Sequence, residues 1–186
     1  MRVPSGGPAM FLLRCRLVTA PEKLAVEIAH PDIPDGVELH RIAAETGVLD
    51  VNTRYAYVLW CRDFAGTSVV ARSDGAVVGF VTGYRRPDAP HVLFVWQVAV
   101  AAAARGRGIA GRMLDALVAR VPGITALETT VTDGNTASRA LFAAFAARHG
   151  ARLERTELFG TDVLGARHES EILHRISPID RGMMQK

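Results

Sequence analysis

The chain has 186 residues, 49% of them hydrophobic, with 22 basic and 19 acidic side chains and a formal net charge of +3. This length suits one domain with a substantial core, and the hydrophobic content excludes an intrinsically disordered chain. No basic stripe interleaved with aromatic residues is present, so we expect no nucleic-acid partner, although the mild positive charge suits an anionic small ligand. No apolar run approaches the ~20 residues that span a bilayer, so we expect no membrane partner.

The two ends of the chain differ in composition from its middle. Residues 1–20 are expected to form a weakly ordered extension in which Met10 is an alternative start, 21–178 a single domain, and 179–186 a short tail. Cys15 and Cys61 have neither disulfide-framework nor metal-site spacing, which favours reduced thiols in a cytoplasmic protein.

Two helices are predicted in the first third of the chain. A short strand fits within 23–36 before Pro, Asp and Gly residues interrupt it. The apolar spacing of 37–46 predicts a helix that ends at Gly47. A second helix is predicted after Asn52 or Thr53, with an apolar face made by Tyr55, Val58 and Leu59.

The hydrophobic period then changes from helical to strand-like. Two β-branched runs around Ser73-Asp74-Gly75 predict a hairpin over 67–84, and 91–100 predicts a third strand buried on both faces. From Ile109 the apolar spacing predicts an amphipathic helix, which Pro122-Gly123 ends.

The remaining elements alternate between strand and helix. A strand over 124–131, a helix over 135–147 and two strands over 151–158 and 168–176 are predicted. Strand–helix–strand alternation implies a parallel pair inside a mixed α/β sheet. Glu169 is expected on the last of these strands, on the same face as Glu171.

The stretch Arg105-Gly106-Arg107-Gly108 lies where a predicted strand meets a predicted helix. Helix N-termini bind phosphate because their first N–H groups are unpaired, and glycine lets the anion approach. Gly106, Gly108 and Gly111 formally match a dinucleotide fingerprint, but a hairpin precedes them and no ribose-binding acidic residue follows at the expected place. A tight turn with solvated arginines is the alternative.

The wider pattern resembles a known superfamily. Val98-Ala99-Val100, four small residues and then Arg105-x-x-Gly108-x-Ala110 are similar to the pyrophosphate motif of the GNAT N-acetyltransferases. Asn135 with the following Ala137, Ser138, Leu141 and Phe142 resembles their second motif. The resemblance implies an α/β GNAT fold whose mixed central sheet is splayed at the strand before the pyrophosphate-binding helix. It implies acetyl-CoA as cosubstrate, held by Val98, Val100, Arg105, Gly106, Arg107, Gly108, Ile109, Ala110 and Asn135.

Several separated strings narrow the resemblance. Residues 49–71, 94–100, 127–142 and 168–176 are similar to the L-2,4-diaminobutyrate N4-acetyltransferases of ectoine biosynthesis, and the likeness covers about 36–176. It implies acetyl transfer from acetyl-CoA to the 4-amino group of L-2,4-diaminobutyrate by direct attack in a ternary complex. A homodimer is also implied, with a substrate site made by Asp50, Tyr55, Trp96 and Glu169.

The residues themselves leave several candidates for the catalytic base and none for the catalytic acid. A substrate ammonium must lose a proton before it attacks, and Glu169 is the first choice of base, with Glu128 second and water a third route. Phe142 stands where many relatives have an acidic tyrosine, so the proton donor to the thiolate is unassigned.

Structural alternatives remain for several of these residues: a helix cap for Asp50, core for Trp96, a buried polar group for Glu128 and a solvated strand face for Glu169. Cys61 has no paired histidine nearby, so no covalent intermediate is expected. His91, His149 and His174 form no ligand set, so we expect no metal. Acetylation of another amine and a non-catalytic acyl-CoA-binding module are the competing functions.

Overall fold

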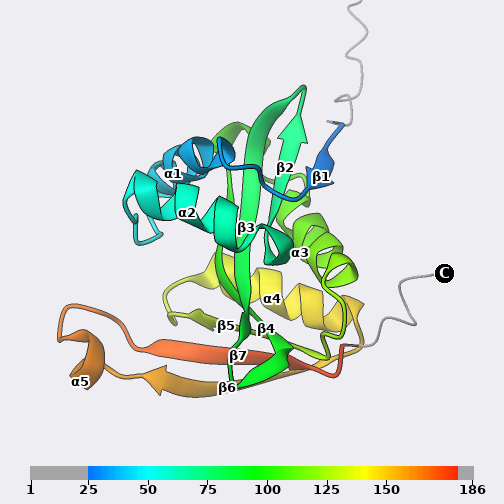
Figure 1. Ribbon diagram of the computed structural model, residues 1–186. Helices are drawn as coiled ribbons and strands as arrows, with labels where there is room; N and C mark the ends of the chain where they lie inside the picture. Colours follow the sequence, from blue (N-terminus) through cyan, green and yellow to red (C-terminus); the bar gives the residue numbers. More distant parts are fainter. Residues whose placement is uncertain (1–24, 180–186) are drawn as a thin grey trace, which may run out of the picture.

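The computed structural model describes residues 25–179, which form one seven-stranded sheet with the strand order β1-β2-β3-β4-β5-β7-β6 (Figure 1). The predicted extension over 1–20 and the tail beyond residue 179 lie outside the described residues. Within the described part, no helix is long and apolar enough to cross a membrane, and no three His, Cys, Asp or Glu side chains are grouped to hold a metal ion.

The elements follow the predicted order, with a short early strand and one additional short helix. They are β1 (Glu27–Ala29), α1 (Asp35–Thr46), α2 (Arg54–Asp63), β2 (Val69–Ser73), β3 (Ala76–Arg86), β4 (Ala89–Val100), α3 (Ile109–Arg120), β5 (Ala126–Val131), α4 (Thr136–Arg148), β6 (Arg152–Phe159), α5 (Thr161–Leu164) and β7 (Glu171–Ser177). The helix α5 was not predicted.

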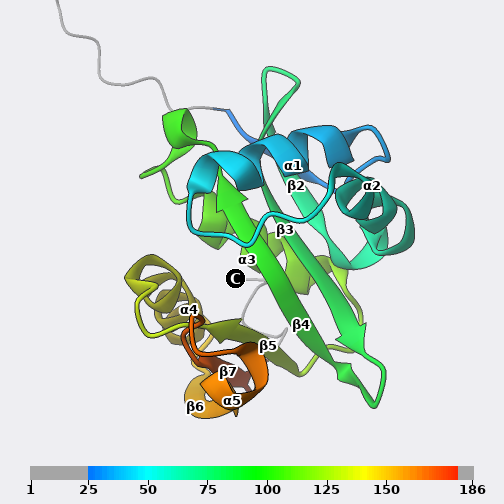
Figure 2. The same cartoon turned by 90° about the vertical axis from the view of Figure 1, so that its left-hand side faces the viewer.

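Helices cover both faces of the sheet. Helices α1 and α2 lie across β3 and β4 on one face, and α3 lies behind these strands (Figure 2). The larger core cluster gathers apolar side chains of α3 and α4 with those of β2 to β5 and β7. The smaller cluster joins α1 and α2 to β2, β3 and β4. Burial on both faces makes this sheet the centre of the domain.

Local signals account for the β2–β3 hairpin and for the helix ends. Asp74 and Gly75 have φ values of 51° and 80°, and a two-residue turn with positive φ at both positions matches the twist of the flanking strands. Gly47 ends α1 with a φ of 67°. Thr53 caps α2 by accepting a hydrogen bond from the amide of Ala56, so Asp50 does not cap this helix.

The predicted inward face of α2 is wrong. Tyr57 and Cys61 are buried there, whereas Tyr55 is 73% exposed. The physical reason is the Tyr57 hydroxyl, which donates to Gln97 Oε1 at 3.0 Å while its ring makes an edge contact with Phe80. A tyrosine with a buried hydrogen-bond partner therefore determines which face of the helix packs inward.

The third strand is not buried on both faces, as had been predicted. Along β4 the buried positions alternate with half-buried ones from Phe94 to Val100. Thr82 pairs with Gln97 and Gly83 pairs with Val95, so Trp96 is an extra residue in a β-bulge. The bulge changes the face of the sheet on which the following buried side chains lie. Val95 packs in the larger cluster, whereas the buried Gln97 accepts a hydrogen bond from Tyr57 of α2 on the other face.

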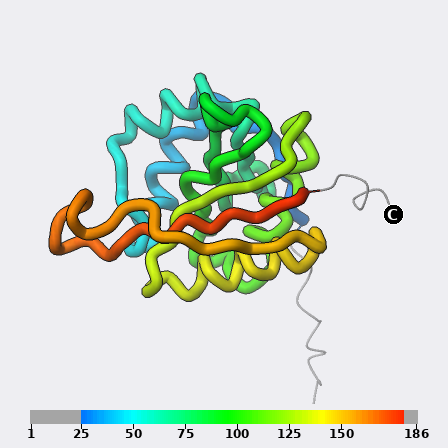
Figure 3. Tube along the Cα trace, turned by 90° about the horizontal axis from the view of Figure 1, so that it is seen from below, coloured from blue at the N-terminus to red at the C-terminus, as the bar shows by residue number. Residues whose placement is uncertain are grey.

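The last two strands pair antiparallel and run side by side to a protruding loop (Figure 3). Strand β7 begins at Glu171, three residues later than the predicted strand over 168–176. Glu169 therefore lies in the loop before β7, and its expected place on a strand face shared with Glu171 is wrong. Helix α5 and the turn after it occupy this loop. The sequence of the loop has no apolar periodicity from which its structure could be predicted.

Strands β4 and β5 form a parallel pair that is unusually short for their lengths. Only Val92, Leu93 and Phe94 pair with Ala126, Leu127 and Glu128. Strand β4 continues to Val100 and β5 to Val131 without further pairing between them. This ladder is compatible with the predicted splay, and it leaves an opening between the carboxyl ends of two parallel strands.

Candidate active site

A pocket of about 780 Å³ lies at the end of this opening. Its walls come from the loop after α1, the end of β4, the N-termini of α3 and α4, and the loop before β7. The lining residues are Thr46, Val48, Leu49, Val98, Ala99, Val100, Ala104, Arg105, Gly106, Gly108, Ile109, Ala110, Gly111, Thr132, Gly134, Asn135, Thr136, Ala137, Ser138, Leu141 and Glu169. Helix N-termini and free strand edges make the pocket rich in backbone N–H donors.

The turn before α3 has the geometry of an anion site. Gly106 and Gly108 have φ values of 75° and 71°, where side chains are disfavoured, and Gly108 is the N-cap residue of α3. No side chain caps this helix, so its first N–H groups and its positive dipole end face the pocket. Ile109 contributes only backbone, because its side chain is buried in the core.

The two arginines of this turn differ in their placement. The Arg105 Nε donates to the carbonyl of Val100 at 3.0 Å, which holds its guanidinium at the pocket wall. Arg107 is exposed and does not line the pocket. Of the predicted pair, Arg105 is therefore the one that lines the pocket.

The end of β4 presents main-chain groups to the pocket. The amide of Ala101 donates to the carbonyl of Val78 in β3. Because alternate residues of a strand direct their backbone groups to opposite sides, Val98 and Val100 direct theirs away from β3 and toward the opening. Both residues line the pocket, where their main-chain groups face an extended opening.

The opposite wall is the N-terminus of α4. Asn135 caps this helix by accepting a hydrogen bond from the amide of Ser138 at 3.0 Å. Its side-chain oxygen is therefore used by the helix, and its amide nitrogen is the group available for a ligand. Phe142, seven residues after Asn135, is buried in the core and does not line the pocket.

Glu169 reaches the pocket from the loop before β7. Its Oε2 accepts a hydrogen bond from the amide of Gly134 at 3.0 Å, and no arginine or lysine pairs with it within the described chain. The residue is solvent-exposed, so it can exchange a proton with water. A carboxylate that is neither buried nor neutralised retains the acceptor capacity that a base requires.

The other three predicted substrate residues do not line the pocket. Asp50 follows the pocket residue Leu49, and its carbonyl accepts from the Gln97 side chain at 3.0 Å. Tyr55 is mostly exposed at the start of α2. Trp96 is half-buried and stacks on Trp60 with ring centroids 4.3 Å apart. The structure therefore joins Glu169 to the cofactor-type residues and leaves these three on the neighbouring α2 side of β4.

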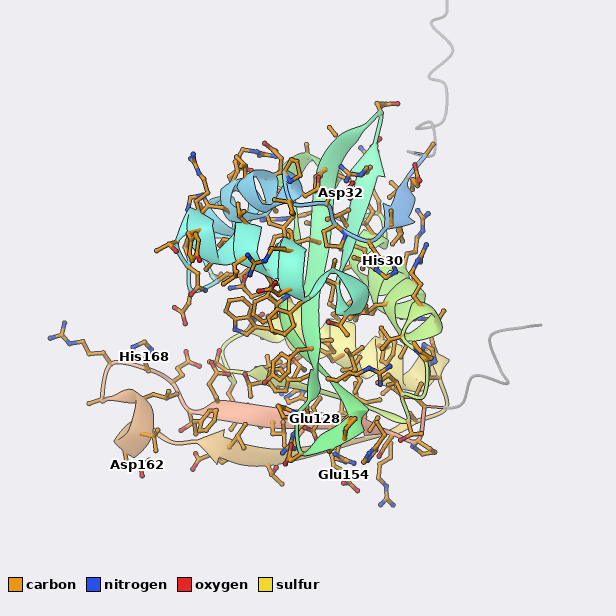
Figure 4. The ribbon with its side chains drawn as sticks, in the orientation of Figure 1. His30, Asp32, Glu128, Glu154, Asp162 and His168 are labelled. Atoms are coloured by element: carbon orange, nitrogen blue, oxygen red, sulfur yellow. The ribbon has the colours of Figure 1, made fainter. Side chains whose placement is uncertain are left out.

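Glu128 is a buried polar group, which was the structural alternative to its role as a base. It is 2% exposed on β5, within the sheet (Figure 4). Arg86 of β3 and Arg175 of β7 pair with its two oxygens. It does not line the pocket. Both carboxylate oxygens are engaged by guanidinium groups, so the geometry of Glu128 favours a structural role.

Several pocket residues were missed by the sequence reasoning. Thr46, Val48 and Leu49 come from the end of α1, far in sequence from either motif, and carried no chemical signal. Gly134 had a usable signal, because it lies directly before the Asn135 cap and within the similar string 127–142.

Comparison with known proteins agrees with this site. The model of the acetyltransferase (GNAT) family matches residues 37–146. The L-2,4-diaminobutyric acid acetyltransferase of Streptomyces avermitilis is 53% identical over 172 residues, covering 90% of this chain and 95% of the relative. That of Halomonas elongata is 42% identical over 154 residues, covering 81% of this chain and 80% of the relative.

Solved structures give the same grouping. Diaminobutyrate acetyltransferase EctA from Paenibacillus lautus, in complex with L-2,4-diaminobutyric acid and coenzyme A, has a TM-score of 0.81 and 36% identity, covering 85% of this chain and 98% of that chain. A GNAT acetyltransferase from Bacillus cereus at 16% identity has a TM-score of 0.65, which shows a shared fold. The chain belongs to the acetyltransferase (GNAT) family, among the L-2,4-diaminobutyric acid acetyltransferases.

Proposed function

We propose that the protein transfers the acetyl group of acetyl-CoA to the 4-amino group of L-2,4-diaminobutyrate, a step of ectoine biosynthesis. The observation that carries the proposal is the 53% identity to a relative of that name, with 95% of the relative covered. The splayed pocket between β4 and β5 supports it, because an extended thioester can enter there with its anionic end at the N-terminus of α3.

In this proposal the cosubstrate lies along the end of β4. The main-chain groups of Val98 and Val100 pair with the pantetheine arm, and the turn from Arg105 to Ala110 binds the pyrophosphate, with Arg107 as a more distant positive charge. An N–H of residues 98–100 polarises the thioester carbonyl and stabilises the oxyanion that forms on it. Asn135 contributes its amide nitrogen from the opposite wall.

Glu169 is the proposed base. The substrate ammonium, with a pKa near ~10, transfers one proton to Glu169, directly or through water. The neutral nitrogen attacks the carbonyl carbon, the C–S bond breaks as the tetrahedral intermediate collapses, and coenzyme A leaves as a thiolate. Since Phe142 cannot donate a proton, water protonates the thiolate, whose ordinary pKa near ~8.5 makes it a good leaving group.

The amino acid part of the substrate is proposed to bind beside β4, on the side of the loop after α1. Asp50 offers a carboxylate to an ammonium group, Tyr55 a phenol to the carboxylate, and Trp96 a ring face to a cation. These three residues share one side of the strand, next to the pocket wall formed by Leu49.

The test is release of coenzyme A thiol from acetyl-CoA against a panel of amines, with the acetylation position determined by NMR. We expect turnover with L-2,4-diaminobutyrate and product acetylated only at N4. Turnover with a polyamine, an aminoglycoside or a peptide in its place would overturn the substrate. Tight binding of coenzyme A without turnover of any amine would indicate a binding module.

Glu169→Gln tests the base. The amide cannot accept a proton, so we expect kcat to fall about 100-fold or more while the affinity for coenzyme A is retained. Glu171→Gln is the matched control, because Glu171 begins β7 outside the pocket lining. Equal activity of the two variants would move the base elsewhere.

We also propose that the enzyme is a cytoplasmic homodimer. Two groups of exposed apolar side chains support an interface, one around the loop after α1 and one on the β6–α5 segment. They are Val48, Val51, Tyr55, Leu158, Phe159 and Val163. Light scattering should give twice the 20.0 kDa chain mass, and Val163→Glu with Phe159→Lys should return a monomer.

A further inference from the structure

The loop between β5 and α4 is held by contacts on two sides. It runs over residues 132–135, which line the pocket except at Asp133. One side contacts the carboxylate of Glu169, and the other is tied to β6. This loop therefore connects the proposed base to side chains that do not contact either substrate.

Gly134 and Glu169 fit each other closely. The Gly134 amide donates to Glu169 Oε2 at 3.0 Å. A Cβ added at Gly134 would lie 2.8 Å from Glu169 Oε1, closer than side chains pack. The backbone there has no positive φ, so alanine would fit the loop and would displace only the carboxylate.

Arg155 of β6 ties the other side of the loop to the sheet. One of its terminal nitrogens pairs closely with the carboxylate of Asp133, and its Nε donates to His174 Nε2 at 3.2 Å. His174 is buried on β7, so it fixes the direction of the guanidinium. Arg139 of α4 adds a second tie, donating to the Asp133 carbonyl at 3.1 Å.

We infer that Gly134 and Arg155 are positioning residues for Glu169: Gly134 holds the carboxylate through its N–H and its lack of a side chain, and Arg155 holds the loop that carries Gly134. The inference rests on the proposed function in one respect, the role of Glu169 as base. The exposed Arg155–Asp133 pair contributes little stability, so its effect is expected in kinetics rather than in unfolding.

Two variants test the kinetic part. Gly134→Ala should lower kcat for the diamino acid by about 100-fold, because displacing a reacting group by about 1 Å costs that much. Arg155→Leu should lower kcat by about tenfold, less than Gly134→Ala because Arg139 still holds the loop. In Arg155→Leu the KM for acetyl-CoA should stay within about twofold, and Arg155→Lys should recover part of kcat.

Arg152→Leu is the matched control. Arg152 lies on the same strand, its side chain is 79% exposed, and among residues 25–179 it forms an ion pair only with Glu154, at 3.3 Å. It should match the wild-type enzyme in kcat and KM. An equal loss in Arg152→Leu and Arg155→Leu would mean that the charge of the strand matters rather than the loop, and would overturn the inference.

A measurement without turnover separates this inference from the proposed function. In proton–nitrogen NMR spectra, the Gly134 amide resonance should shift in Glu169→Gln and shift in the same direction in Arg155→Leu, but not in Arg152→Leu. Unmoved resonances would overturn the positioning role even if diaminobutyrate is acetylated. Shifted resonances in a protein that acetylates no amine would overturn the proposed function and leave the positioning intact.

Discussion

Tyr57→Phe removes one buried hydroxyl and nothing else. Tyr57 is fully buried, its ring contacts Phe80 and His40 edge-on, and its hydroxyl donates to Gln97 Oε1 at 3.0 Å. Phenylalanine keeps both ring contacts and leaves no cavity. The cost is therefore the lost hydrogen bond and the unpaired oxygen of Gln97, which is itself 5% exposed.

The expected loss of folding free energy in Tyr57→Phe follows from that unpaired oxygen of Gln97. A buried acceptor left without a donor costs about 1 to 3 kcal/mol of folding free energy. This range applies because both Tyr57 and Gln97 are buried. For a chain of this size, each kcal/mol lowers Tm by about 2 to 4 °C, so we expect Tm to fall by about 2 to 12 °C. Urea unfolding should show the same loss of free energy with an unchanged m value.

A double-mutant cycle tests whether the loss comes from the hydrogen bond between Tyr57 and Gln97. Gln97→Leu leaves the Tyr57 hydroxyl and the Asp50 carbonyl unpaired, and should cost more than Tyr57→Phe. The double variant should be more stable than the sum of the two losses predicts, by about 1 kcal/mol. Tyr84→Phe is the control, because the hydroxyl of Tyr84 makes no hydrogen bond within residues 25–179. Equal stability of Tyr57→Phe and Tyr84→Phe would refute the reasoning.

Three further predictions concern the site and its supports. Gly108→Ala should weaken coenzyme A binding in calorimetry, because a Cβ at a φ of 71° costs about 1 kcal/mol and must shift the turn; unchanged affinity would contradict the anion-site geometry. Burial, then Arg155 and Arg139, lower the pKa of His174 below its usual 6.5. The unfolded chain then binds more protons than the folded one below pH 6.5, so the free energy of unfolding should fall as pH drops from 7.5 to 5.5. His174→Gln should lose less over the same interval, and an equal loss in both proteins would refute the assignment. Burial, with a smaller contribution from Asp35, raises the pKa of Cys61 to about 12, so the native thiol should resist alkylation at pH 8, and Cys61→Ala should keep kcat within about twofold. Loss of turnover in Cys61→Ala at unchanged folding would indicate a covalent intermediate.

Elements with local signals could be predicted from the sequence. The hairpin at Asp74-Gly75 and the helix end at Gly47 depend on backbone conformations that few residues adopt, so their signal lies within two or three positions. The turn at Gly106 and Gly108 is of the same kind. The backbone conformation of this turn was therefore predictable before any contact was known.

Features that depend on strand pairing could not be predicted in this way. The bulge at Trp96 follows from the registers of β3 and β4, and the β-branched run around it gives no sign of an extra residue. Glu128 could be a base or a buried group until its partners Arg86 and Arg175 were seen, 42 and 47 residues away in the chain. Glu169 reaches the pocket because β7 starts late, which alternation alone did not reveal.

The three-pair ladder between β4 and β5 has a consequence for the lifetime of the protein. Along this seam the two parts of the sheet share few main-chain hydrogen bonds, and acetyl-CoA is proposed to bind across the rest of the gap. A ligand that binds only the folded chain adds about 2.7 kcal/mol of stability at a concentration 100 times its Kd. Resistance to proteolysis and to heat would then rise and fall with the supply of acetyl-CoA, so that the enzyme persists when its acetyl donor is abundant.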